Sequence, residues 1–214
     1  MSLPRTLENC PSVLFIVYTP GPDAEAKGYE PWLVRVDNPF FNAIPGVRHY
    51  ANWKLERVLA GTPPYTWFDF QGLEAASDLE RVWFNKDLDA FRTEWVRLWG
   101  YGAGKPPPVQ TNAYLMQPVQ APRGAPRPFA LVIGGRGKAP ATMDLAWQVE
   151  ETIRKHFAIG PAAGAWRVPI AQDNPLGADW IALTYGDSTA ALAAAYAPSG
   201  EDFAFVARLV AAPE

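Results

Sequence analysis

Hydrophobic and polar positions along the chain follow two alternating patterns. Short runs of apolar, β-branched and aromatic residues are separated by longer segments whose apolar residues have helical spacing. The first run, SVLFIVYTP at 12–20, has little alternation and predicts a strand that is buried on both faces. Similar runs predict further strands at 47–59, 65–70 and 112–119.

Two helical segments lie between these strands. The segment 23–44 has Asp23 as a candidate N-cap, and Pro39 should kink or break it. Its apolar positions recur every four residues, at Trp32, Val36 and Phe40. The segment 77–100 begins with a capping-box pattern, has an apolar face and ends at a glycine. The first half therefore has the order β-α-β-β-α-β.

The second half repeats this order after a proline-rich segment. The predicted elements are a strand at 129–135, a helix at 142–160, strands at 165–171 and 178–186, a helix at 187–197 and a strand at 202–211. The segment QAPRGAPRP at 120–128 predicts a linker. We therefore divide the chain into repeat 1 at 12–119 and repeat 2 at 129–212.

The β-α-β-β-α-β order is that of the ferredoxin-like unit, whose helices cover one face of its sheet. The other face is also apolar here, so it needs a partner. The second half of the chain can supply that partner. We therefore predict an α+β fold of two tandem ferredoxin-like βαββαβ repeats, packed sheet to sheet as a pseudo-dimeric α/β barrel. The expected state is a monomer with this internal pseudo-dimer, or a homodimer.

Composition excludes several functional classes. The net charge of −3 is spread over interspersed acids and bases, which predicts no nucleic-acid partner. One cysteine and two histidines, His49 and His156, predict no disulfide and no metal site. No apolar run is long enough for a membrane span, so we expect a cytoplasmic protein without a membrane partner. No dinucleotide or phosphate-loop motif occurs, and we expect no cofactor.

One stretch carries a family resemblance. The sequence YEPWLVRVDNPFFNAIPGVRHYANW at 29–53 resembles the signature region of EthD-like proteins of the dimeric α/β-barrel superfamily. The matching positions are Tyr29, Trp32, Asp37 two positions before Pro39, the Pro45-Gly46 pair, Val47 and Tyr50. Three features differ from that pattern. The spacing from Trp to Pro is one residue longer, Asp37 stands where a histidine is usual, and two repeats are fused.

The resemblance implies a small-molecule site between sheet and helices or inside the barrel. Relatives act on aromatic or polyketide-like compounds as cofactor-independent oxygenases, cyclases or degradation accessories. We therefore expect an enzyme or enzyme-like protein for a small aromatic or polyketide-like ligand. The alternative is a non-catalytic small-molecule-binding or stress-associated barrel protein, and a third possibility is a barrel without any ligand.

Strand alternation selects the candidate site residues. If Val47 packs under the helices, Tyr50 and Asn52 point into the barrel, together with Trp67 and Asp69 of the next strand. Tyr50 and Asp69 can exchange protons, Asn52 can hold an oxygen, and Trp67 can stack on a planar ligand. His49 is a further acid/base candidate by its intrinsic pKa, and Asp37 is a candidate at the pocket mouth. The catalytic candidates are thus His49, Tyr50 and Asp69, and the substrate-binding candidates are Asp37, Asn52 and Trp67.

Each of these side chains also has a purely structural interpretation. Tyr50 and His49 can be core residues, Asp69 can bond to backbone N–H groups of the following turn, and Asp37 can cap the chain near Pro39. A cavity above ~300 Å³ with unpaired polar groups would favour a ligand site over a core.

Overall fold

The computed structural model describes residues 5–83, 86–100, 111–120, 126–137, 145–149, 178–198 and 200–213. Its strands are β1 (Ser12–Tyr18), β2 (Val47–Ala60), β3 (Trp67–Leu73), β4 (Thr111–Gln120), β5 (Phe129–Gly135), β6 (Leu145–Val149), β7 (Trp180–Gly186) and β8 (Phe203–Ala211). They form a closed barrel in the order β1-β3-β2-β8-β5-β7-β6-β4, and every neighbouring pair is antiparallel. The mixed α+β class and the barrel agree with the sequence prediction.

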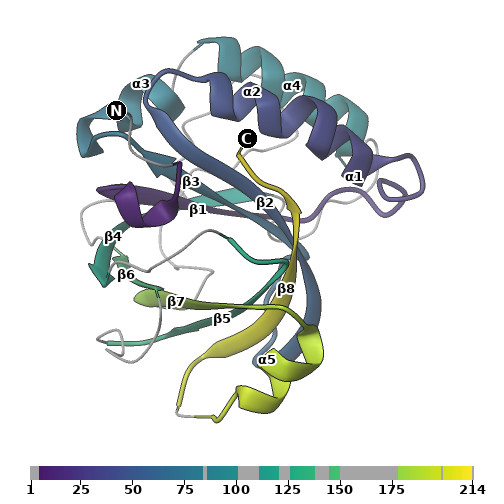
Figure 1. The fold of residues 1–214 in the computed structure, drawn as a ribbon. Coiled ribbons are helices and arrows are strands. Elements are labelled where there is room, and N and C mark those ends of the chain that lie inside the picture. The colour runs from purple at the N-terminus through teal and green to yellow at the C-terminus, as the bar shows by residue number, and fades with distance from the viewer. Residues whose placement is uncertain are drawn as a thin grey trace.

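Most helices in the described ranges lie on one side of this barrel (Figure 1). The helical elements are η1 (Leu7–Asn9), α1 (Tyr29–Trp32), the π-helix η2 (Leu33–Asp37), α2 (Asn38–Ala43), η3 (Ala76–Asp78), α3 (Leu79–Trp83), α4 (Lys86–Trp99) and α5 (Thr189–Ala195). Figure 1 shows α1 to α4 on the side of β1, β2 and β3, while α5 lies at the opposite end beside β8. The first half thus has a thick helical layer over its sheet.

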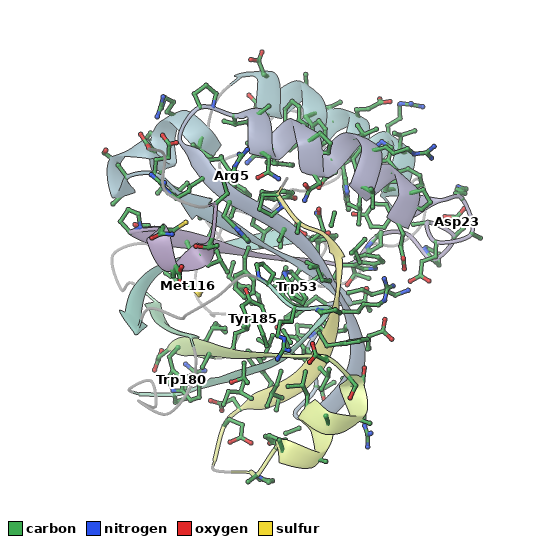
Figure 2. All side chains as sticks on the ribbon, viewed as in Figure 1. Arg5, Asp23, Trp53, Met116, Trp180 and Tyr185 are labelled. Carbon is green, nitrogen blue, oxygen red and sulfur yellow. The ribbon has the colours of Figure 1, made fainter. Side chains whose placement is uncertain are left out.

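Two hydrophobic cores lie on opposite faces of the first-half sheet. The barrel interior holds side chains such as Phe15, Trp53, Phe68 and Phe70 from the first half, packed with Phe205 and others from the second. Trp53 and Tyr185 stack inside the barrel with 6.0 Å between ring centroids (Figure 2). The other core lies between this sheet and the helices α1 to α4, and is also rich in aromatic residues.

Most predicted strands coincide with observed strands, but the first helix begins later than predicted. It starts at Tyr29, after Gly28 in the left-handed conformation (φ 93°), and Asp23 is not its cap. The side of this helix that faces the sheet also differs from the prediction. Val36 is 43% exposed, whereas Leu33 and Asp37 are buried. The four-residue apolar spacing failed here because a π-helix changes which residues face the sheet.

The predicted helix at 142–160 is wrong where it can be compared, because Leu145–Val149 forms strand β6. The residues of this segment are compatible with a helix or a strand, and hydrogen bonding to β4 and β7 stabilises the strand. The remainder of that helix with His156, and the predicted strand at 165–171, lie outside the described residues. So does most of the linker at 120–128.

An ion-pair cluster joins the two halves on the outside. Arg208 of β8 contacts Glu30 of α1 at 2.8 Å and Glu56 of β2 at 2.9 Å, so its charge is paired with acids and does not enter the barrel. Lys54 adds contacts to Glu25 and Glu30. These side chains flank the seam where β2 pairs with β8.

No helix in the described ranges is both long and apolar enough to cross a membrane.

Candidate functional site

The π-helix directs two successive polar residues toward the sheet. At its end, the backbone N–H of Asn38 donates to the carbonyl oxygen of Leu33, five residues earlier. This wider turn leaves Asp37 and Asn38 both buried, at 3% and 5% exposure, although they are adjacent in sequence. In a regular α-helix successive side chains point about 100° apart. The π-turn is therefore the local reason that both residues reach the same site.

A β-bulge determines which face of β2 the other site residues occupy. The pairing between β2 and β3 shifts between Val47 and His49, so regular alternation is interrupted there. Val47 and Tyr50 consequently both pack in the core under the helices. The predicted position of Tyr50 inside the barrel is therefore wrong.

The correction extends to the neighbouring strand. Trp67, expected in the barrel, packs in the core under the helices, whereas Phe68 and Phe70 of the same strand lie in the barrel interior. Asn52 is paired with Asp69 across the two strands, and both bond to Tyr50. The grouping of these polar residues agrees with the prediction, but the group lies on the opposite face of the sheet.

The Tyr50 hydroxyl bridges two buried carboxyl groups. It lies 2.9 Å from Asp37 Oδ2 and 2.7 Å from Asp69 Oδ2. A tyrosine hydroxyl has one proton and can donate it to only one of these oxygens at a time. The other contact is a hydrogen bond only when that carboxyl group is itself protonated. The geometry therefore fits a pair of acids that holds a proton.

Asn52 fixes the two acids from the side. Its Nδ2 donates to Asp37 Oδ2 at 2.8 Å and to Asp69 Oδ1 at 2.9 Å, and its Oδ1 accepts from Asn38 Nδ2 at 3.0 Å. Asn38 is held in turn by Asn42, whose Nδ2 donates to Asn38 Oδ1. Both donors of Asn52 are thus occupied by the acids. The expected role of Asn52 as a direct holder of a ligand oxygen becomes a role in positioning the acids.

A chain of hydrogen bonds between tyrosine and tryptophan side chains continues from Asp69. Tyr18 donates to Asp69 Oδ1 at 3.0 Å, and its hydroxyl also hydrogen-bonds with Tyr29. The Tyr29 hydroxyl accepts from Trp95 Nε1 at 3.0 Å. Polar atoms from β1, α1 and α4 are thereby connected to the acid pair.

Burial dominates the electrostatics of the acid pair. Loss of solvent raises the pKa of Asp37 to about 7. Burial, together with repulsion from Asp37, raises the pKa of Asp69 well above its usual range. Burial and the nearby acids also raise the pKa of Tyr50. At neutral pH the pair therefore retains at least one proton.

A small cavity adjoins the pair on the helix side. Its volume is about 60 Å³, and it is lined by Ile16, Tyr18, Tyr29, Asp37, Phe41, Tyr50, Asp69, Trp83, Phe91, Arg92 and Trp95. Phe91 is half-buried and stacks on Phe40 with 4.0 Å between centroids, so it lies at the outer side of this lining. The volume is far below the ~300 Å³ that we set for a ligand pocket.

Three predicted site residues do not line this cavity: Asn52, which contacts the acids from the side, Trp67 and His49. Trp67 does not line it, and its ring instead packs edge-on against Tyr29 at 5.2 Å and under the Lys54 ammonium at 5.3 Å. His49 is buried with Nδ1 3.0 Å from the carbonyl oxygen of Arg5, so Nδ1 carries the proton. Burial lowers the pKa of His49 to about 4, which keeps it neutral at pH 7.

Sequence reasoning missed much of the lining. Tyr18 belongs to a strand that is apolar on both faces, so alternation gave no signal for it. Arg92 offered one, because it stands at helical spacing among the buried residues Leu88, Trp95 and Trp99 of α4. Its guanidinium donates to the Trp83 carbonyl oxygen at 2.9 Å and lies 4.3 Å from the Trp83 ring centroid.

Taken together, the described residues define an antiparallel α/β barrel with a buried acid pair beside a small aromatic-lined cavity. No group of three or more His, Cys, Asp or Glu residues in the described ranges is arranged to hold a metal ion.

Comparison with known proteins adds little to this description. No family model matches the sequence, and no curated protein matches it. Among solved structures, the crystal structure of an anthrone oxidase-like protein is similar, with 9% identity and a TM-score of 0.47 over 94% of this chain and 91% of that one. This likeness is too slight to support an inference, so the fold described here rests on the strand pairing alone.

Proposed function

We propose that the protein binds a small aromatic or polyketide-like compound and transfers protons at it with the acid pair Asp37 and Asp69, without a metal or organic cofactor. The observation that carries this proposal is the Tyr50 hydroxyl, which lies within hydrogen-bond distance of both buried carboxyl groups at the wall of a cavity. Resorcinol, a benzene ring with two hydroxyl groups in a 1,3 arrangement, is a simple probe for this class.

The chemistry follows from a pair that shares a proton. The ionised carboxylate accepts a proton from a ligand hydroxyl, and the protonated partner gives its proton to the neighbouring ring carbon. The product is the keto tautomer of the ligand, and reversal of both transfers restores the phenol. Tyr50 can pass a proton between the carboxyls, since it contacts both. A pKa of about 7 for Asp37 suits general acid–base catalysis near neutral pH.

Ligand entry requires a side chain to move. A cavity of about 60 Å³ holds a few water molecules, whereas a benzene ring occupies a cavity of ~150 Å³. Phe91 is the candidate for this movement, because it is half-buried while Arg92 and Trp95 of the same helix are only 6% and 9% exposed. We expect Phe91→Ala to enlarge the cavity and to strengthen ring binding.

The EthD-like, tandem arrangement is part of this proposal, and the strand order of the barrel supports its tandem part. Its strand order divides into β4-β1-β3-β2 and β8-β5-β7-β6, which have the same relative order within each half. The halves meet reciprocally, since β2 pairs with β8 and β4 pairs with β6. Two fused ferredoxin-like repeats account for both observations, and one chain then forms the pseudo-dimer that relatives form from two.

Deuterium exchange tests the proposed function. Resorcinol in D2O exchanges the ring hydrogens next to its hydroxyls through the keto tautomer, and proton NMR follows their loss. We expect the protein to accelerate this exchange by at least about 100-fold, the usual contribution of general acid–base catalysis. Asp69→Asn should abolish the acceleration, while Asp202→Asn, at an exposed position, should retain it. Equal exchange by the wild type and Asp69→Asn would refute the proposal.

The small cavity favours a second candidate, a barrel that binds small molecules without catalysis or has no ligand. The polar groups around the acid pair are largely satisfied by one another, as a structural network would be. In that case Phe91→Ala would lower stability without creating a resorcinol site. Calorimetric titration of this variant with resorcinol distinguishes the two candidates.

A further inference from the structure

Gln71 of β3 is an exception to the paired polar groups of this core. Its side chain is completely buried, and neither Oε1 nor Nε2 has a hydrogen-bond partner in the described part of the chain. Leaving a buried amide without partners is unfavourable, so most buried polar groups in native proteins are paired. An apolar residue of similar size would avoid this cost, which indicates that the amide serves another purpose.

Strand register places Gln71 next to the acid pair. It is paired with Tyr50 on β2 and with Leu14 on β1, and it follows Asp69 by two residues along β3. Residues two apart in a strand point to the same face. Tyr50 and Leu14 both pack in the core under the helices. The Gln71 amide therefore lies on the helix side of the sheet, in the row beside the one that holds Asp69. Gln71 does not line the present cavity, so a ligand contacts it only when the cavity enlarges along the sheet.

The side-chain amides of the neighbouring Asn52 and Asn38 already have hydrogen-bond partners. Asn52 donates to both carboxyl groups, and Asn38 donates to Asn52 Oδ1 and to the Tyr50 carbonyl oxygen. Among these buried amides, Gln71 is the one whose donor and acceptor both remain available. It can bond to a hydroxyl group in either direction, because a hydroxyl both donates and accepts.

We propose that Gln71 determines ligand specificity by binding a second oxygen of the ligand whose first oxygen faces Asp69 and Tyr50. Directly opposed residues have Cβ atoms about 5 Å apart, and residues two apart in a strand are about 7 Å apart. A single aromatic ring with hydroxyls in a 1,3 or 1,4 arrangement spans distances of this order. The inference rests on the proposed function and narrows its substrate class to ligands with two ring oxygens.

The test compares resorcinol with phenol, which lacks the second hydroxyl. Their dissociation constants are measured by calorimetric titration of the wild type and of Gln71→Met, and melting temperatures are measured without ligand. We expect the wild type to prefer resorcinol by about tenfold, since a buried amide left unpaired by phenol weakens binding. Gln71→Met should lose this preference and melt about 2–4 °C higher, because an apolar side chain removes the unpaired amide.

The control is Leu73→Met, a buried position on the same face of the same strand, which should keep the preference for resorcinol. Gln71→Leu serves as a second apolar variant if the methionine packs poorly. A retained preference in both Gln71 variants, or a lower melting temperature in both, overturns the inference. Wild-type binding of phenol and resorcinol with equal affinity overturns it while the proposed function stands. Failure of both compounds to bind the wild type overturns the proposed function and the inference together.

Discussion

Replacing Asp37 by asparagine should make the protein more stable at alkaline pH. Burial raises the pKa of this carboxyl from its ordinary value of 3.8 to about 7. Between these values the folded chain keeps a proton that the unfolded chain has lost, so the unfolding free energy falls as the pH rises. The stabilisation that comes from keeping Asp37 protonated in the folded chain is complete near pH 4 and is lost as the pH rises past 7.

The size of the effect follows from the same shift. One pKa unit corresponds to about 1.4 kcal/mol, so a shift of about three units lowers the unfolding free energy by about 4 kcal/mol from pH 4 to pH 8. The amide introduced by Asp37→Asn cannot ionise, and its oxygen can accept the bonds from Tyr50 and Asn52 that Asp37 Oδ2 accepts. The variant should therefore match the wild type near pH 4 and exceed it by up to about 4 kcal/mol at pH 8.

Urea unfolding followed by tryptophan fluorescence provides the assay, because the chain has nine tryptophans. The informative quantity is the unfolding free energy of Asp37→Asn minus that of the wild type at each pH, with exposed Asp202→Asn as the control. Asp69 is present in both proteins, so the unfolding free energy of each can still depend on pH. A difference that stays constant from pH 4 to pH 8 would refute the account of Asp37 as a buried, protonated acid.

Three other substitutions test separate parts of the fold. Tyr50→Phe removes the hydroxyl between the acids and should lower the unfolding free energy by about 2–4 kcal/mol in urea unfolding; no change would mean that the bridge is not formed. Gly72→Ala places a Cβ against Cys10 Sγ, and overpacking should lower the unfolding free energy by about 1–3 kcal/mol, whereas an unchanged melting curve would contradict this packing. Arg208→Met breaks partly exposed ion pairs, and should lower the unfolding free energy by about 1 kcal/mol in low salt and by less in 1 M NaCl.

The barrel could be predicted from the sequence because strands and turns follow local rules. The runs at 12–20, 129–135 and 202–211 are short, apolar and bounded by turn residues, and each forms a strand of the barrel. The segment at 145–149 could not be assigned in this way, because its pairing with strands distant in sequence decides its conformation. Long-range pairing of this kind leaves no local signal.

The members of the acid cluster were partly predictable, but their side of the sheet was not. Alternation correctly grouped Tyr50, Asn52 and Asp69, because they follow the bulge in β2 or lie on a regular strand. The bulge itself adds one residue between Val47 and Tyr50, which reverses the face of everything after it. No residue in VRHY marks that bulge, so the register could be read only from the structure.

The π-turn at Leu33–Asp37 has a consequence for how such a site can arise and disappear. A π-turn accommodates one extra residue within a helix. The surplus is confined to one turn, so Tyr29 before it and Phe41 after it both still pack under the helices against the sheet. The acid at position 37 is thus governed by chain length as well as by side-chain identity. Loss of one codon for an exposed residue such as Arg35 would turn that carboxyl away from Tyr50 without altering any residue of the cluster.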